Sequence, residues 1–67
     1  MNVAKLKGAI TAAGYTQNSL AEKMGKSKSS FNRKVNGLTP FDIFEVQELC
    51  ELLALNDSDI KVEIFLT

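Results

Sequence analysis

Apolar residues recur every three or four positions along the first part of the chain, a pattern typical of amphipathic helices. In the first run they are Val3, Leu6, Ile10 and Ala13. Asn2 precedes this run as a good N-cap, and Gly14 follows it as a stop. The second run consists of Leu20, Ala21 and Met24. Because Thr16 precedes it and Gly25 follows it, the sequence predicts two consecutive helices before residue 26.

A third, shorter helix is predicted over 27–36. Ser27 is its expected N-cap, and Phe31 and Val35, four positions apart, are its expected buried residues. Its other face is polar or basic. Asn36-Gly37 follows as a pair suited to left-handed backbone, so the helix is expected to stop there.

The fourth predicted helix begins at a capping box formed by Asp42 and Glu45 and runs to about Leu53. Its apolar positions are Ile43, Phe44, Val46, Leu49, Cys50, Leu52 and Leu53. Such a broad apolar stripe predicts the central helix of the core, with Cys50 as a small buried hydrophobic residue.

The last segment carries two signals. Asp57-Ser58-Asp59 is typical of a helix start, whereas Ile60, Val62, Ile64 and Leu66 alternate as in a strand. We favour a fifth helix over residues 58–66, with the strand as the alternative. Ile64, Phe65 and Leu66 are expected either to close the core or to form an interface. The chain is therefore predicted to be one all-α domain, 1–67, a compact bundle of four to five short helices.

Composition narrows the class of protein. A chain of 67 residues has room for one small core, and 45% apolar with 24% charged residues is ordinary for a globular domain. No apolar run suits a membrane span or a signal peptide, so a cytoplasmic, nucleoid-associated protein is expected. With one cysteine and no histidine, we expect no disulfide, no metal and no cofactor. So small a core also favours a partner subunit.

The formal net charge is zero, which by itself argues against nucleic-acid binding. The charges are nevertheless divided along the chain. Residues 1–41 hold seven Lys or Arg and one Glu (7 − 1 = +6), whereas residues 42–67 hold one Lys and seven acidic residues (1 − 7 = −6). Five basic residues lie between Lys23 and Lys34. This division predicts a basic face toward phosphates and an acidic half facing away from them; two solvated helix faces are the alternative.

The connection Met24-Gly25-Lys26-Ser27 has the length of the turn in a helix-turn-helix, whose second helix protrudes and enters the major groove. Lys and Arg suit guanine acceptors, Asn suits adenine, and Ser suits several base edges. Lys26, Ser27 and Lys34 are better suited to phosphate.

Taken together, these positions resemble the lambda-repressor-like helix-turn-helix domains of phage repressors and Cro proteins. The residues that carry the resemblance are Thr16-Gln17, Leu20-Ala21, Met24-Gly25, Ser27 and Asn36-Gly37. The stretch from Pro40 to Phe65 is similar to a subset of small prophage proteins. The resemblance implies that Gln17 contacts phosphate and that the third helix reads bases. The base-reading residues would be Lys28, Ser29, Asn32 and Arg33. Ile10 and Val35 stand where many family members carry an Arg–Glu pair, so an apolar contact is expected there instead.

The sequence therefore predicts a small transcriptional regulator that binds double-stranded DNA. A twofold dimer on a palindromic operator is expected, because it doubles the phosphate contacts. The alternative is a protein-interaction module of the same fold, similar to an antirepressor, which zero net charge favours. An enzyme is not expected, since Ser27, Ser29 and Ser30 have no histidine to activate them. No membrane or small-molecule partner is expected either.

Overall fold

Each helix begins directly after a polar residue whose side chain accepts a backbone N–H of the first turn, which is otherwise without a partner. These N-caps are Asn2, Thr16, Ser27, Asp42 and Asp57. At Asp42 the capping box with Glu45 is formed as predicted. A second box, which the sequence pattern did not predict, joins Thr16 to Ser19. The caps thus divide the chain into helices where the sequence predicted them.

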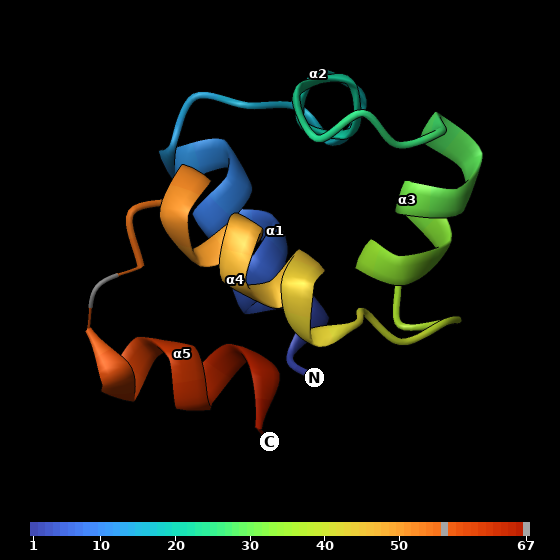
Figure 1. Cartoon of the computed structure of the whole chain (residues 1–67). Helices are drawn as coiled ribbons and strands as arrows, with labels where there is room; N and C mark the ends of the chain where they lie inside the picture. The colour runs from blue at the N-terminus through green and yellow to red at the C-terminus, as the bar shows by residue number, and fades with distance from the viewer. Residues whose placement is uncertain (56, 67) are drawn as a thin grey trace.

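The computed structural model describes residues 1–55 and 57–66, and within these ranges it contains five helices and no strand (Figure 1). They are α1 (Val3–Ala12), α2 (Gln17–Lys23), α3 (Lys28–Val35), α4 (Ile43–Leu52) and α5 (Ser58–Phe65). The predicted all-α fold is confirmed, and the alternating end of the chain is a helix. None of the described helices has the length and apolar character that a membrane span requires.

Left-handed backbone ends most of the helices. Gly14, Gly25 and Gly37 follow α1, α2 and α3 with positive φ angles of 86°, 69° and 78°. Asn36, expected to share this conformation, instead has φ −85° as the C-cap of α3, so only the glycine of that pair is left-handed. After α4 the same place is taken by Ala54, with φ 55°, a conformation that costs more for a residue with a Cβ.

Every helix contributes buried side chains to the core. Helix α1 is at its centre and packs against α2, α3 and α5. Its fully buried large side chains are Leu6, Ile10, Leu20, Phe31, Val35, Leu49 and Ile64. Ile10 and Val35 are both in this core, as an apolar substitute for an ion pair requires. The backbone N–H of Asn2 donates to the carbonyl of Ile64 (2.7 Å), which fixes the start of α1 against the end of α5.

The prediction that α4 is the central core helix is wrong. Its inward line consists of Glu45, Leu49 and the C-cap Leu53, four residues apart, so Ile43 and Phe44 face outward and are 63% and 76% exposed. Cys50 is only half-buried. Ile64 is core rather than interface, whereas Leu66 is exposed. The apolar stripe of α4 is broad enough to fit several orientations, and contacts with other helices select the one observed.

Candidate nucleic-acid interface

A tight turn joins α2 to α3, and the two helices pack directly against each other. Gly25 reverses the chain with its positive φ, and the N–H of Lys26 donates back to the carbonyl of Ala21 (2.9 Å). In Figure 1 α2 is seen along its axis while α3 descends beside it, so the helices cross steeply. The predicted helix-turn-helix arrangement is present, with α3 at one edge of the molecule.

Two buried side chains determine which face α3 presents to solvent. Phe31 and Val35 are fully buried, and the ring of Phe31 meets that of Phe41 edge to face, with centroids 5.9 Å apart. Each residue of an α-helix is rotated by about 100° from the one before. Ser29 and Arg33 therefore point away from the core, and Asn32 lies at the flank of that outward face. Lys28, three residues before Phe31, lies on the side of the buried pair, at the first position of the helix.

Lys28, Ser29 and Arg33 are all exposed. Neither the Lys28 ammonium nor the Arg33 guanidinium has an ion-pair partner among the residues that the structure describes. Three of the four predicted base-reading side chains are thus exposed, with their donors open to solvent, and two of them, Ser29 and Arg33, share the outward side of α3.

Asn32 differs from the other three because it is half-buried. Its Oδ1 is buried and has no hydrogen-bond partner in the described structure. Paired recognition of adenine uses both the oxygen and the nitrogen of an asparagine amide. In the conformation observed, Asn32 cannot offer both atoms, so a base-reading role would require its side chain to rotate.

The predicted phosphate contacts are also partly assembled. Gln17 is half-buried in the first turn of α2, and Ser27 and Lys26 are exposed in the turn before α3. The Ser27 hydroxyl accepts the N–H of Ser30 (3.2 Å), which leaves its own proton available to donate. These three side chains lie at the starts of the two helices, where backbone N–H groups also favour anions.

Lys34 was expected to contact phosphate, but in the structure its ammonium is bound to another side chain. Its Nζ lies 2.8 and 2.7 Å from the two carboxylate oxygens of Glu45 on α4, and its side chain is only 23% exposed. Glu45 is 3% exposed and also accepts the N–H of Asp42 (3.0 Å). The ammonium of Lys26 lies 3.8 Å from the same carboxylate. In this structure Lys34 is therefore committed to Glu45 rather than to solvent.

The sequence pattern did not predict this ion pair, which joins residues eleven positions apart on different helices. One signal was present. Glu45 shares the helical register of Leu49 and Leu53, and a carboxylate on a buried line requires a cation nearby. Glu45 also corrects the expectation that the acidic half faces away from the basic half. A second pair, Lys5–Glu63 (2.7 Å), joins the two halves between α1 and α5.

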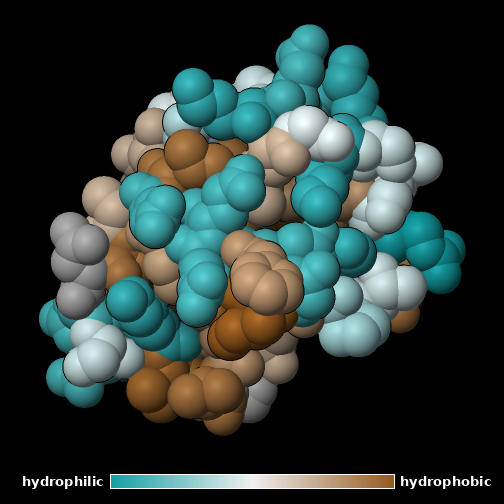
Figure 2. Space-filling model, in the orientation of Figure 1, coloured by the Kyte–Doolittle hydropathy of each residue, from teal (hydrophilic) through white to brown (hydrophobic). Residues whose placement is uncertain are grey.

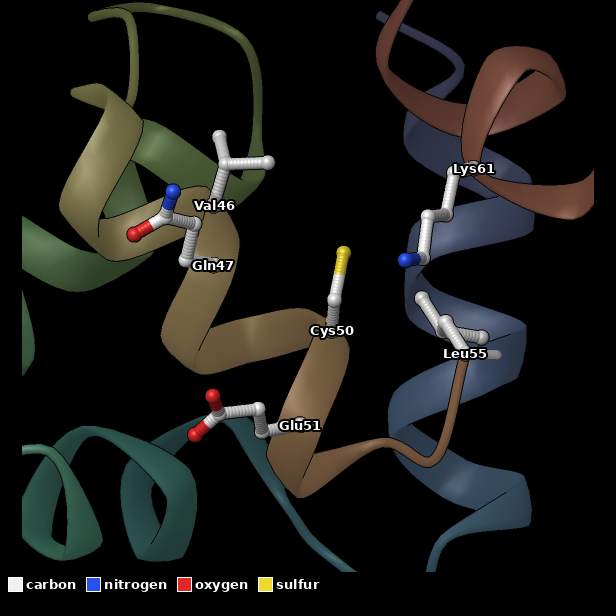
Figure 3. Close-up of a pocket in the computed structure, with 6 residues that line it drawn as sticks. All are labelled: Val46, Gln47, Cys50, Glu51, Leu55 and Lys61. Atoms are coloured by element: carbon white, nitrogen blue, oxygen red, sulfur yellow. The ribbon is translucent and has the colours of Figure 1, made fainter. Parts of the chain in front are cut away.

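A separate cleft lies between α4 and α5, where the Lys61 side chain extends toward the Cys50 thiol (Figure 3). Burial raises the pKa of the Cys50 thiol, and the charge of Lys61 offsets this only in part. Cys50 therefore stays a protonated thiol at neutral pH, which is a poor nucleophile. The described residues contain no group of acidic, histidine or cysteine side chains that could hold a metal ion.

The chain matches no protein-family model, no curated protein and no solved structure.

Proposed function

We propose that this protein binds double-stranded DNA as a small transcriptional regulator similar to phage Cro proteins and repressors, with α3 in the major groove. The observation that carries the proposal is the exposed face of α3. Lys28, Ser29 and Arg33 are exposed on a short helix whose orientation is set by two buried residues, and among the described residues neither cation has an ion-pair partner. A protruding helix with such donors fits the width of the major groove.

The same geometry supports the proposed phosphate contacts. Gln17, Lys26 and Ser27 flank α3 at the starts of the two helices, where they would meet the backbone on either side of the groove. Zero net charge does not oppose this proposal, because local cations and not the total charge determine counterion release.

We propose further that two copies bind a palindromic site together. An apolar groove next to the end of α3 supports a second copy as its occupant. It is lined by Met1, Leu38, Phe41, Ile43, Phe65 and Leu66, among others, and by no Lys, Arg, Asp or Glu within the described residues. Figure 2 shows brown, apolar side chains over the first turn of α4 and along the lower edge over α5. A hollow beside protruding Leu38 and Leu66 suits a self-complementary, twofold contact.

The same groove supports a second candidate function. If the groove receives another protein rather than a second copy, the chain is an interaction module of the same fold, similar to an antirepressor. Exposed apolar patches of this kind mark protein contacts more often than nucleic-acid contacts. The two functions differ in what they require of α3.

Selection of bound fragments from random duplexes, followed by mobility shifts, tests the DNA proposal. We expect Arg33→Ala and Lys28→Ala each to weaken binding to the selected site by about tenfold to a hundredfold, as loss of a base contact does. Because both residues are exposed, the thermal melting curves should stay close to that of the unaltered protein.

Lys61→Ala is the matched control, since it removes one positive charge from α5, beside the α4–α5 cleft. It should leave the selected site bound nearly as before. Unchanged affinity in both α3 variants would remove α3 from recognition, and failure to select any duplex at low salt would favour the interaction module.

A further inference from the structure

The Lys34–Glu45 contact joins the proposed recognition helix to the helix that follows it. The Glu45 carboxylate is almost completely buried, and both of its oxygens lie within hydrogen-bond distance of Lys34 Nζ. Lys26, in the turn before α3, lies within 4 Å of the same carboxylate. A single acidic side chain thus draws in cations from both ends of α3.

These two lysines belong to the densest cluster of positive charge in the chain, between Lys23 and Lys34. A lysine that is held by a buried carboxylate neutralises no phosphate, so it displaces none of the cations condensed on the DNA. Lys23, Lys28 and Arg33 have no such partner in the described structure. The charge that α3 and its turn can offer to DNA is therefore smaller than the sequence suggests.

We propose, on the basis of the DNA-binding function above, that Glu45 limits the affinity of this protein for DNA by competing with phosphate for Lys34 and Lys26. Glu45 also holds α3 against α4 through Lys34. It therefore fixes the orientation of α3 and at the same time lowers the nonspecific attraction of the protein for phosphate. Most substitutions that loosen a binding site weaken binding. Removal of the Glu45 charge is predicted to make the protein less rigid and yet to increase its affinity for phosphate.

Glu45→Gln separates the two roles. Glutamine at this position still accepts the N–H of Asp42, because Gln serves in a capping box as Glu does, so α4 keeps its start. The substitution removes the charge that holds the two lysines. Circular dichroism with a thermal melt establishes that the variant is folded before binding is measured.

The measurement is the dependence of affinity on salt, with a random-sequence duplex of roughly 20 base pairs, about two helical turns. Each freed lysine should steepen the slope of log K against log salt by about 0.9 per subunit. If both are freed, the gain in affinity over the unaltered protein should be about tenfold larger at 50 mM than at 200 mM salt.

Glu51→Gln is the matched control. Glu51 is an exposed glutamate on the same helix, in the α4–α5 cleft, with no ion pair among the described residues. It changes the net charge by the same amount and should leave the slope unchanged. The double variant Glu45→Gln/Lys34→Gln restores the original net charge and should lose the part of the gain that Lys34 carries.

Equal slopes for Glu45→Gln and Glu51→Gln would overturn the proposal, as would a folded Glu45→Gln protein that binds more weakly at every salt concentration. Neither result would affect the proposed function, provided that the unaltered protein binds its selected duplex. If the unaltered protein binds no duplex at low salt, both proposals fall together.

Discussion

Burial changes the acid–base behaviour of Cys50, and at the scale of a single residue this gives the fold a pH dependence. A cysteine in an unfolded chain loses its proton near pH 8.5. In the folded protein burial raises the pKa of the Cys50 thiol, against the smaller opposing effect of Lys61. The folded state therefore binds more protons than the unfolded state in the interval between the two pKa values.

The sign of the effect follows from this difference. Where the folded state binds more protons, the free energy of unfolding falls as pH rises. We expect this contribution to be constant below about pH 8.5 and to decline above it. Urea unfolding at pH 7 and pH 10 should show a larger loss of stability for the unaltered protein than for Cys50→Ser, which does not titrate there. Parallel losses in the two proteins would show that the thiol is not desolvated.

At the scale of the element, α3 depends on Phe31 for its attachment. The ring is fully buried and meets Phe41 at an interplanar angle of 63°. Phe31→Ala should lower the free energy of unfolding by about 3–5 kcal/mol, through lost burial and the cavity left behind. Ser29→Ala, on the exposed face of the same helix, should change it by no more than about 0.5 kcal/mol. Chemical denaturation of both variants measures this, and a stable Phe31→Ala protein would show that α3 faces the other way.

The helices themselves were predictable because their boundaries are local. A capping side chain such as Asp57 acts within one turn, and α5 begins directly after it in spite of the alternating residues that follow. The orientation of α4 was not predictable in the same way. Its apolar residues surround most of the helix, and the choice of Leu49 over Phe44 as the buried side depends on neighbours that only the folded chain brings together.

In the candidate site, too, local features were predictable from the sequence and contacts between helices were not. The exposure of Ser29 and Arg33 follows from the buried positions of α3, which the sequence reveals, whereas that of Lys28 does not, since Lys28 lies on the side of Phe31 and Val35. The inward carbonyl of Asn32 and the capture of Lys34 by Glu45 depend on packing between elements. Periodicity assigns a residue to a face of its helix, but it does not identify which residue of another helix lies opposite.

At the scale of the whole molecule, the divided charge and the apolar groove suggest how two copies would meet. The chain carries no net charge, so two copies do not repel each other strongly at neutral pH. The groove adjoins the turn after α3, so a twofold contact there would place the two copies of α3 on either side of one twofold axis. Simultaneous binding to half-sites requires such an arrangement.

A charge placed in the groove tests this contact. Ile43 is exposed in the first turn of α4, where an added carboxylate favours the helix, so Ile43→Glu should fold normally. Across a twofold contact it would place two like charges together, and the dissociation constant of the dimer should rise by at least about tenfold.

Ile60→Glu, at an exposed position in the first turn of α5 outside the groove, is the matched control and should leave the dimer intact. Analytical ultracentrifugation with and without the selected duplex measures both. A dimer that survives Ile43→Glu, or an unaltered protein that binds the duplex as one copy only, would assign the groove to a different protein partner.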